Sequence, residues 1–319
     1  MGIQMQKFDI LAVGELNVDL IMTGFQSMPI IGREIVGKDF SCILGSSTAI
    51  CACAMASLGL KTTFYGKMGT DAFGDVVVKY LDKYSVDTSN IVVEDKRRTG
   101  VTVSMSFGTD RSLVTCNGDS IDEIVGEDIT DEMLKTARHL HVGAFFLQSK
   151  IRPGLADLFK RAQKLGVTTS LDCSWDESGN WDYGIFEVLK YTDIFFPNEG
   201  EALAITGNDY SVAEAAEKLA EYAKICVVKC GPKGAYVKLQ SDANPLQAET
   251  YGAKVVDTTG AGDSFNAGFL YAYLNGMSIE DCMKYGNATG SVSVTRMGGT
   301  TACPTLHEVE NTIKTGHVE

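Results

Sequence analysis

The sequence has too little positive charge to favour a polyanionic partner. Its 319 residues contain 28 Lys and Arg against 41 Asp and Glu, which gives a formal net charge of −13. Nucleic acids and anionic membranes are bound by clustered Lys and Arg, so we expect neither as a partner. A small phosphate-bearing ligand stays compatible with this charge, because backbone N–H groups and metal ions can form an anion site inside an acidic protein.

The sequence also lacks the patterns of membrane-spanning, exported and disulfide-rich proteins. It has no run of about eighteen apolar residues, and residues 1–7 hold no basic segment that leads into a long apolar stretch. The nine cysteines are odd in number and form no CxxC pair. We therefore expect no signal peptide, no transmembrane helix, and buried free thiols in a reducing cytoplasm.

Two common phosphate-binding motifs are missing as well. The Gly-Lys-Ser/Thr ending of the P-loop is absent, and so is the GxGxxG spacing of dinucleotide-binding folds. In their place the chain has residues 257–263, DTTGAGD, followed by a helical pattern. Glycines let a backbone approach a ligand, and a helix N-terminus attracts anions. The segment predicts a phosphate site of backbone amides, assisted by metal ions because the loop holds no lysine.

Strand patterns alternate with helical patterns along most of the chain. The strands are expected at residues 8–13, 62–65, 139–146, 168–172, 194–197 and 225–229, with helices at 49–58, 75–84, 154–165, 212–222 and 266–274 and a loop at 66–74. The alternation predicts an α/β fold with a mainly parallel sheet and helices on both faces. Ligands bind such sheets at the carboxyl ends of the strands.

Two segments interrupt this rhythm. Residues 20–40 read as short strands and turns, and residues 97–116 contain a hairpin pattern around a turn at 108–111. We expect them to form a small β appendage on a single domain of residues 1–319, since no repeat, low-complexity tract or proline-rich linker divides the chain.

Asp263 has two interpretations at the start of the last-named helix. A carboxylate at the mouth of an anion site would repel a phosphate, but it suits a base that lies between an acceptor hydroxyl and a bound electrophile. The alternative is that Asp263 caps the helix, a frequent role of aspartate. The surrounding DTTGAGD sequence favours the catalytic interpretation.

Four segments together resemble one known family. Residues 257–269, DTTGAGDSFNAGF, resemble the C-terminal signature of the ribokinase family, also called the PfkB carbohydrate kinases. Residues 66–74 resemble its N-terminal signature, residues 198–201 its NxxE element, and residues 229–235 its nucleotide-side strand and turn. The resemblance implies a ribokinase-like three-layer sandwich with a small β lid, and an ATP-dependent kinase acting on a hydroxyl of a sugar or sugar-like molecule.

The resemblance also implies roles for single residues. Asp263 would deprotonate the acceptor hydroxyl. The transferring phosphoryl group would be bound by the amides of Gly260, Ala261, Gly262 and Asp263. Mg²⁺ would be organised through water by Asn198 and Glu201. The nucleotide side is expected at Lys229, Gly231, Gly234 and Asn287. A potassium site beside the anion site would involve Asp257, Thr259, Ser293, Arg296 and Gly298, with only backbone available at Ala302.

The acceptor side departs from the family pattern. The expected substrate residues are Asn17, Asp19, Gly45, Ser46 and Arg111. Asn17 and Asp19 alternatively stabilise their loop as Asx turns, and Arg111 alternatively is a solvated turn residue. Ile50 stands where the family usually has a sugar-binding asparagine, so plain ribokinase specificity is not expected. Hydroxyls of Ser46, Ser47 or Thr48 are candidate replacements.

Other features leave alternatives open. His139 and His141 share one strand face, which permits a metal pair, but no third ligand is apparent and buried histidines are expected. Asp172 matches a family aspartate that lines the cleft, or caps the next turn. The rivals of a sugar kinase are a nucleoside (adenosine-type) kinase of the same family and a non-catalytic sensor, although a retained Asp263 argues against the sensor. The family's lid often mediates dimers, so a homodimer through the lid is a further expectation.

Overall fold

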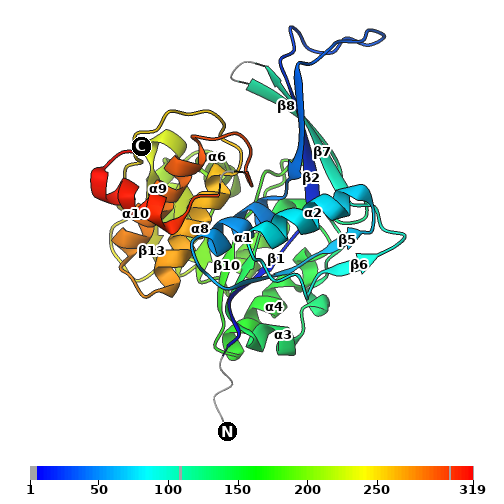
Figure 1. The fold of residues 1–319 in the computed structure, drawn as a ribbon. Helices are drawn as coiled ribbons and strands as arrows, with labels where there is room; N and C mark the ends of the chain where they lie inside the picture. The colour runs from blue at the N-terminus through cyan, green and yellow to red at the C-terminus, as the bar shows by residue number, and fades with distance from the viewer. Residues whose placement is uncertain (1–5, 108–109, 302, 319) are drawn as a thin grey trace.

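A central eight-stranded sheet organises the protein (Figure 1). The computed structural model describes residues 6–107, 110–301 and 303–318, except for the side chains of residues 107, 110 and 111. The strand order is β14-β13-β12-β11-β10-β9-β1-β4. In chain order these strands are β1 (Phe8–Val13), β4 (Thr62–Tyr65), β9 (Ala137–Val142), β10 (Thr168–Leu171), β11 (Ile194–Phe195), β12 (Ile225–Lys229), β13 (Ala235–Leu239) and β14 (Leu246–Ala248). Strands β12 to β4 pair in parallel, and β13 and β14 form an antiparallel edge. The predicted mainly parallel sheet is confirmed.

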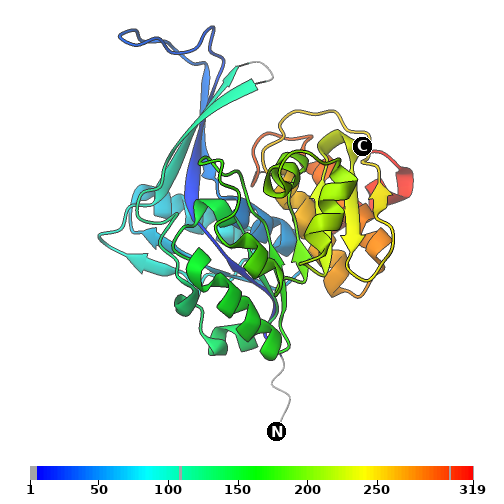
Figure 2. The same ribbon diagram turned by 180° about the vertical axis from the view of Figure 1, so that it is seen from behind.

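Helices cover both faces of the sheet, as the two opposite views show (Figures 1 and 2). One core contains residues of α1 (Ser47–Ser57), α2 (Ala72–Lys83), α8 (Ala261–Leu274), α9 (Ile279–Ser293) and α10 (Leu306–Thr315). The other contains residues of α3 (Asp131–Lys135), α4 (Arg152–Lys164), α5 (Ile185–Leu189), α6 (Glu199–Thr206) and α7 (Val212–Ala220). Alternation along β1 supplies both cores, because Ile10 and Ala12 enter the first while Leu11 and Val13 enter the second. The predicted three-layer sandwich is confirmed.

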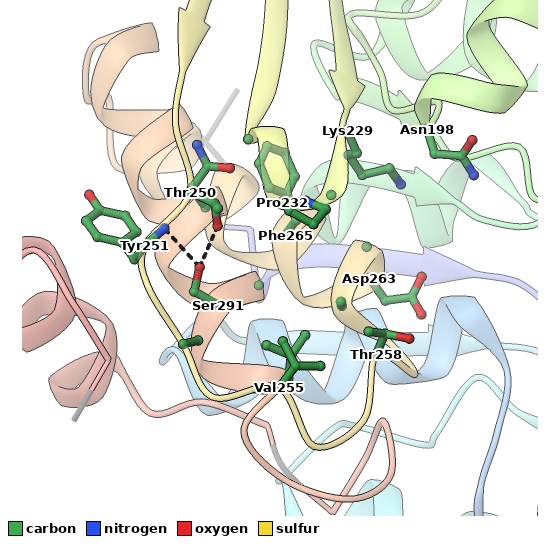
Figure 3. A pocket seen from close by; sticks show the side chains of 18 of the residues that line it. Asn198, Lys229, Pro232, Thr250, Tyr251, Val255, Thr258, Asp263, Phe265 and Ser291 are labelled. Carbon is green, nitrogen blue, oxygen red and sulfur yellow. Dashed lines mark hydrogen bonds between the residues drawn. The ribbon is translucent and has the colours of Figure 1, made fainter. Parts of the chain in front are cut away.

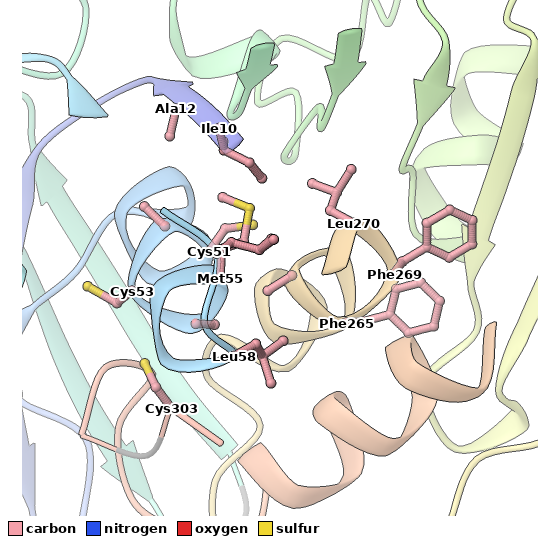
Figure 4. Packing of buried hydrophobic residues seen from close by; sticks show 14 of the residues in the cluster. Ile10, Ala12, Cys51, Cys53, Met55, Leu58, Phe265, Phe269, Leu270 and Cys303 are labelled. Atoms are coloured by element: carbon pink, nitrogen blue, oxygen red, sulfur yellow. The ribbon is translucent and has the colours of Figure 1, made fainter. Parts of the chain in front are cut away.

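Helices α1 and α8 pack against each other inside the first core (Figure 4). Helix α1 is buried along most of its length, as its unbroken run of small apolar residues predicts. Cys51 and Met55 of α1 and Phe265 and Leu270 of α8 belong to the same cluster. The first turns of the two helices are also joined, since the Ser47 hydroxyl contacts Asp263.

A separate four-stranded sheet rises from the body of the molecule (Figure 1). Its order is β3-β2-β7-β8, with β2 (Asn17–Thr23), β3 (Asp39–Leu44), β7 (Gly100–Phe107) and β8 (Asp110–Cys116). Strands β2 and β7 pair in parallel, and the two outer pairs are antiparallel. All four strands come from or directly adjoin the two segments predicted to form a β appendage, and we call this sheet the lid.

Some predicted boundaries are wrong. Residues 66–74 are not one loop, because β5 (Lys67–Gly69) pairs with β6 (Val92–Glu94) and Asp71 caps α2. The predicted strand at 139–146 ends at Val142, since Ala144 takes a left-handed φ of 54° and leads into the 3-10 turn η2 (Phe145–Leu147). The other 3-10 turns are η1 (Gly126–Asp128) and η3 (Gly231–Lys233).

No helix in the described part of the chain is long and apolar enough to cross a membrane.

Candidate active site

A cavity of about 610 Å³ lies beside the first turn of α8 (Figure 3). Many of the residues singled out from the sequence line it, namely Ser47, Asp172, Asn198, Glu201, Lys229, Gly231, Gly234, Ala261, Gly262, Asp263 and Asn287. They come from the carboxyl ends of β10 and β12, from the 3-10 turn that follows β12, and from the first turns of α1, α6 and α8, with Asn287 on α9. The fold therefore gathers the predicted phosphate and nucleotide residues in one place.

Helix α8 begins at Ala261, five residues earlier than predicted, so its first turn contains the glycine-rich segment. Its N-cap is Gly260, with a left-handed φ of 73°, and no side chain among the described residues caps this end. A Cβ on Gly260 would lie 2.9 Å from Ile50 Cγ2 and 3.0 Å from Gly299 Cα, so glycine is required by both conformation and space. The first N–H groups of a helix have no partner within it. Here the Ala261 N–H donates to the Thr258 carbonyl at 3.2 Å, just before the helix, and the absence of a side-chain cap keeps this turn suited to an anion.

Asp263 is the third residue of α8 and not its N-cap. Its Oδ1 accepts a hydrogen bond from the Ser47 hydroxyl at 2.5 Å. Burial raises the pKa of Asp263 to about 8, with a further upward contribution from Asp172, while the Ser47 bond and Lys229 oppose the shift. A carboxyl group that titrates near neutral pH is well matched to a general base.

Lys229 and Asp172 form a buried ion pair at the back of the cavity. Lys229 Nζ lies 2.6 Å from Asp172 Oδ2, which also accepts a 2.6 Å hydrogen bond from Asn266 Nδ2. Burial is the largest single influence and would raise the pKa of Asp172, but the charge and hydrogen bond of Lys229 and the hydrogen bond from Asn266 together hold the pKa below the usual value. Burial would lower the pKa of Lys229, but Asp172 and Glu201 hold it above the usual value. Both groups are therefore charged at neutral pH.

Asn198 and Glu201 form a capping box at the start of α6. Asn198 Oδ1 accepts from the Glu201 N–H at 2.9 Å, and Glu201 Oε2 accepts from the Asn198 N–H at 2.8 Å. The Cys173 thiol also donates to Glu201 Oε2 at 3.2 Å. Burial, with help from Asp172, raises the pKa of Glu201. The pair thus fixes the helix and also presents oxygen atoms at the cavity wall.

Three of the five positions predicted for a potassium site lie together. Asp257 Oδ1 accepts from the N–H and the hydroxyl of Thr259, and Asp257 Oδ2 accepts from the Gly298 N–H at 2.9 Å. The Ser293 hydroxyl instead donates to the Gly290 carbonyl of α9. Within the described chain, the Arg296 side chain forms an ion pair with Glu308 of α10 and not with Asp257. Ala302 lies outside the described residues.

The predicted acceptor residues Asn17, Asp19 and Gly45 meet at the base of the lid. A Cβ on Gly45 would lie 2.3 Å from Asp19 Oδ1 and 2.6 Å from Asn17 Nδ2, so these side chains lie directly against the glycine. Asn17 Nδ2 also contacts Asp19 Oδ1 and Thr102 Oγ1, each at 3.3 Å. The backbone of Arg111 pairs with Ser106 in the lid, and its side chain lies outside the described part of the chain.

The hydroxyls proposed to replace the missing asparagine have different partners. Ser46 is the N-cap of α1, donating to the Glu15 carbonyl at 2.6 Å and accepting from the Ala49 N–H at 3.0 Å. Thr48 Oγ1 donates to Glu15 Oε2 at 2.7 Å. Of the three hydroxyl residues, Ser47 alone lines the cavity. The local helix start therefore occupies Ser46 and Thr48.

Residues 7–306 match the sequence model of the pfkB family carbohydrate kinases. The chain belongs to this family. The prediction of a sugar kinase, a phosphotransferase with an alcohol acceptor, is thereby confirmed, and neither the nucleoside-kinase nor the sensor alternative is favoured.

Several curated relatives are similar over nearly their whole length. A 5-dehydro-2-deoxygluconokinase of Listeria monocytogenes serotype 4b (strain CLIP80459) is 28% identical over 316 residues, covering 96% of this chain and 95% of the relative. The enzyme of the same name from Bacillus subtilis (strain 168) is 28% identical over 323 residues, covering 97% of each chain.

Solved structures of ribokinases share the fold. The ribokinase of Arabidopsis thaliana, complexed with ribose and ATP, gives a TM-score of 0.81 at 27% identity, over 96% of this chain and 99% of that one. An apo putative ribokinase II from E. coli gives 0.85 at 22% identity, over 97% and 99%. The predicted ribokinase-like fold is confirmed.

Two features of this pfkB-family chain were interpreted incompletely from sequence. The alternative of buried histidines agrees with a network in which His139 and His141 both contact the Ser170 hydroxyl, at 2.7 and 2.8 Å, and burial lowers their pKa values to about 3 and about 4. Glu15 received no role, although its buried carboxylate organises the start of α1. Its position directly after a glycine-ended strand was the available signal.

Proposed function

We propose that this kinase transfers the γ-phosphate of ATP to a hydroxyl of a sugar or sugar acid, with Asp263 as the general base. The observation that carries the proposal is the position of Asp263. It stands on an uncapped helix start, at a cavity wall, and burial raises its pKa to about 8. ATP as the donor is supported by the ATP complex of the 27% identical Arabidopsis ribokinase.

The proposed transfer uses few protein groups. Asp263 takes the proton of the acceptor hydroxyl while that oxygen forms a bond to the γ-phosphorus. The bond from the γ-phosphorus to the bridging oxygen breaks, and ADP leaves. The backbone amides of Gly260, Ala261 and Gly262 face the charge on the phosphoryl oxygens, where stabilisation matters most in this chemistry. In the same proposal Lys229, Gly231, Gly234 and Asn287 form the nucleotide side.

The oxygen atoms of Asn198 and Glu201 fit a magnesium site. Mg²⁺ prefers oxygen donors and keeps several of its waters, and both side chains line the cavity. When bound, the ion would neutralise phosphate charge. A potassium ion near Asp257, Thr259 and Gly298 is part of the same proposal, supported by the way Asp257 ties these residues together.

For the acceptor we propose 5-dehydro-2-deoxygluconate or a closely related sugar acid. Relatives named for that activity are 28% identical over 96% of this chain. Asn17 and Asp19 lie together at the lid base, where an amide and a carboxylate suit hydroxyl groups. Arg111 would meet the carboxylate of such a substrate.

A coupled ATP-consumption screen with purified protein tests the proposal. The panel contains 5-dehydro-2-deoxygluconate, 2-keto-3-deoxygluconate, ribose, fructose and adenosine. We expect the highest kcat/KM with one of the two sugar acids, and no turnover without Mg²⁺. A clear preference for a neutral sugar would disprove the proposed acceptor, and turnover of adenosine alone would overturn the sugar-kinase assignment.

We propose further that residues 1–319 form one domain whose lid, from segments 20–40 and 97–116, also carries a homodimer contact. Apolar side chains are exposed on the lid, at Met28, Ile30, Ile31, Val36, Leu113 and Val114. Such clustering is typical of interaction surfaces. All nine cysteines, each within the described chain, are free thiols, which suits a reducing compartment such as the cytoplasm. Sedimentation of wild type and Ile31→Glu distinguishes a lid dimer from a monomer.

A further inference from the structure

Lys229 brings a positive charge to the first turn of α8 from a different element. It is the last residue of β12, and its side chain is only 12% exposed. Its Nζ lies 3.5 Å from the position that a Cβ on Gly262 would occupy. Figure 3 shows Lys229 and Asp263 projecting into the same cavity. The glycine-rich segment holds no lysine, but the folded site has one beside it.

Stability gives an incomplete reason for this ammonium. Buried ion pairs lose much of their attraction to desolvation, and apolar replacements are often equally stable. Asp172, the partner of Lys229, is already bonded to Asn266. Two more carboxylates, Glu201 and Asp263, act on the same ammonium from the cavity walls. A phosphate entering a cavity with three acidic side chains needs a cation close by.

We propose that Lys229 is a catalytic residue that binds the γ-phosphoryl oxygens during transfer, and that Asp172 is its positioning residue. This rests on the proposed function. Without phosphate the ammonium is held by Asp172, and with phosphate it is shared between Asp172 and the phosphoryl group. Lys229 stays protonated throughout, because the acceptor proton goes to Asp263 and the bridging oxygen leaves with ADP. The residue thus supplies from β12 the charge that a lysine supplies within a P-loop.

A charge-removal cycle separates this role from a structural one. Lys229→Met leaves Asp172 buried without its cation, so both thermal stability and kcat fall. Lys229→Met combined with Asp172→Asn removes both charges and keeps the Asn266 contact, so stability returns towards wild type. We expect kcat of the double variant to stay about 10²–10³-fold low, the usual loss when one donor to a developing charge is removed. Recovery of kcat together with stability would show a purely structural pair and overturn the proposal.

Lys233→Met is the matched control. Lys233 follows Lys229 by four residues in the same turn, but it is 70% exposed and pairs with Glu199. We expect its kcat and its KM for ATP to match wild type within about twofold and its melting temperature to stay the same, because exposed ion pairs contribute little. A loss as large as that of Lys229→Met would mean that any charge removed from this turn impairs the enzyme, which contradicts a specific role.

Nucleotide binding tests the same inference without any acceptor. Titration calorimetry compares ATP with ADP, each with Mg²⁺, on wild type and on the double variant. We expect the double variant to lose at least about tenfold in affinity for ATP while ADP changes little, since a hydrogen bond to a charged group is worth about that factor. Equal ATP-to-ADP ratios in the two proteins would refute the Lys229 contact. If the acceptor screen finds no substrate but the ratio of ATP to ADP affinity still differs between the two proteins, the result counts against the proposed function and not against the Lys229 contact.

Discussion

Helices α1 and α8 begin side by side, but their first turns are completed in opposite ways. At α1 the Ser46 hydroxyl caps the helix and the Glu15 carboxylate accepts from Thr48. At α8 the N-cap is Gly260, and no side chain of the described chain takes that place. One helix start is therefore closed by a side chain. The other has no side-chain cap among the described residues, and at its first residue the Ala261 N–H donates to the Thr258 carbonyl at 3.2 Å.

The contrast explains what each sequence motif is for. The hydroxyl-rich start of α1 looks like a sugar-binding segment, but Ser46 and Thr48 are engaged with Glu15. The glycines at α8 remove the side chains that would otherwise compete for its N–H groups. Ser47 connects the two, since it leaves the first turn of α1 to contact Asp263. Polar residues at a helix start indicate a ligand only when the helix does not need them.

The largest expected effect on the rate comes from removing the Asp263 carboxyl group in the first turn of α8, which we call the open end because no side chain of the described residues caps it. Asp263→Asn should lower kcat by about 10²–10⁴-fold, the usual value of a general base, with little change in ATP affinity. Steady-state kinetics on the identified acceptor measure kcat, and calorimetry measures ATP binding. A variant with near-wild-type kcat would leave Asp263 without a catalytic role.

The same variant has a stability signature with a defined sign. Burial raises the pKa of Asp263 from its ordinary value of 3.8 to about 8, so the folded protein binds this proton more tightly than the unfolded chain. The stabilisation from protonation is complete below about pH 4 and is lost as the pH rises through 8. Asp263→Asn should therefore melt at a higher temperature than wild type above pH 8 and lose this advantage near pH 4. An advantage independent of pH would contradict the raised pKa.

Exchanging the two caps gives the next largest effect. Gly260→Ser places a hydroxyl cap on α8, and Gly260→Ala shares its left-handed strain and its contact with Ile50 but has no hydroxyl. A serine cap is worth about 1 kcal/mol, so we expect kcat/KM for ATP in Gly260→Ser to be about fivefold below Gly260→Ala. The reverse change, Ser46→Gly, should lower kcat/KM for ATP by less than about twofold, because glycine is nearly as good a cap as serine. Equal rates in the two Gly260 variants would mean that α8 needs only space there.

Ser47 offers a smaller effect that depends on pH. Its hydrogen bond opposes the raised pKa of Asp263. Ser47→Ala should therefore move the acidic limb of the kcat/KM profile to higher pH by about one unit, since a bond to a charged group is worth about 1.5 kcal/mol. At high pH, where Asp263 is ionised in both proteins, the rates should converge. Ser47→Thr retains the hydroxyl and should restore the profile, and an unshifted limb in Ser47→Ala would rule out this role.

The sequence predicted the helices and strands better than the contacts between residues that are far apart in the chain. The strand at residues 8–13 is found at those bounds because its apolar run and terminal glycine mark both of its ends locally. The catalytic segment was recognisable because its glycines and Asp263 lie together in sequence. Lys229 is 33 positions before Gly262, and no local pattern records their proximity in space. The contact of the Ser46 cap with Glu15 was missed for the same reason, since this bond joins residues 31 positions apart.

The smallest expected effect concerns Ile50, which packs against the open end of α8. Its Cγ2 would lie 2.9 Å from a Cβ on Gly260, and its Cδ1 would lie 2.7 Å from a Cβ on Gly299. Ile50 is only 4% exposed, so it is packed where it supports the glycine turn. We therefore predict that ribose is not the best acceptor, and that Ile50→Asn leaves the ranking of acceptors unchanged.

The inserted amide of Ile50→Asn would be buried without partners, which costs about 1–3 kcal/mol, so its melting temperature should fall. Ile50→Val is the control, because it removes one methylene group and keeps the site apolar. The measurement is kcat/KM for ribose, fructose, 2-keto-3-deoxygluconate and adenosine on all three proteins. A wild type that prefers ribose by about tenfold or more, or an Ile50→Asn that gains such a preference at unchanged stability, would show that this position faces the acceptor. An unchanged ranking with lowered stability places Ile50 in the packing that holds α1 against the open end of α8.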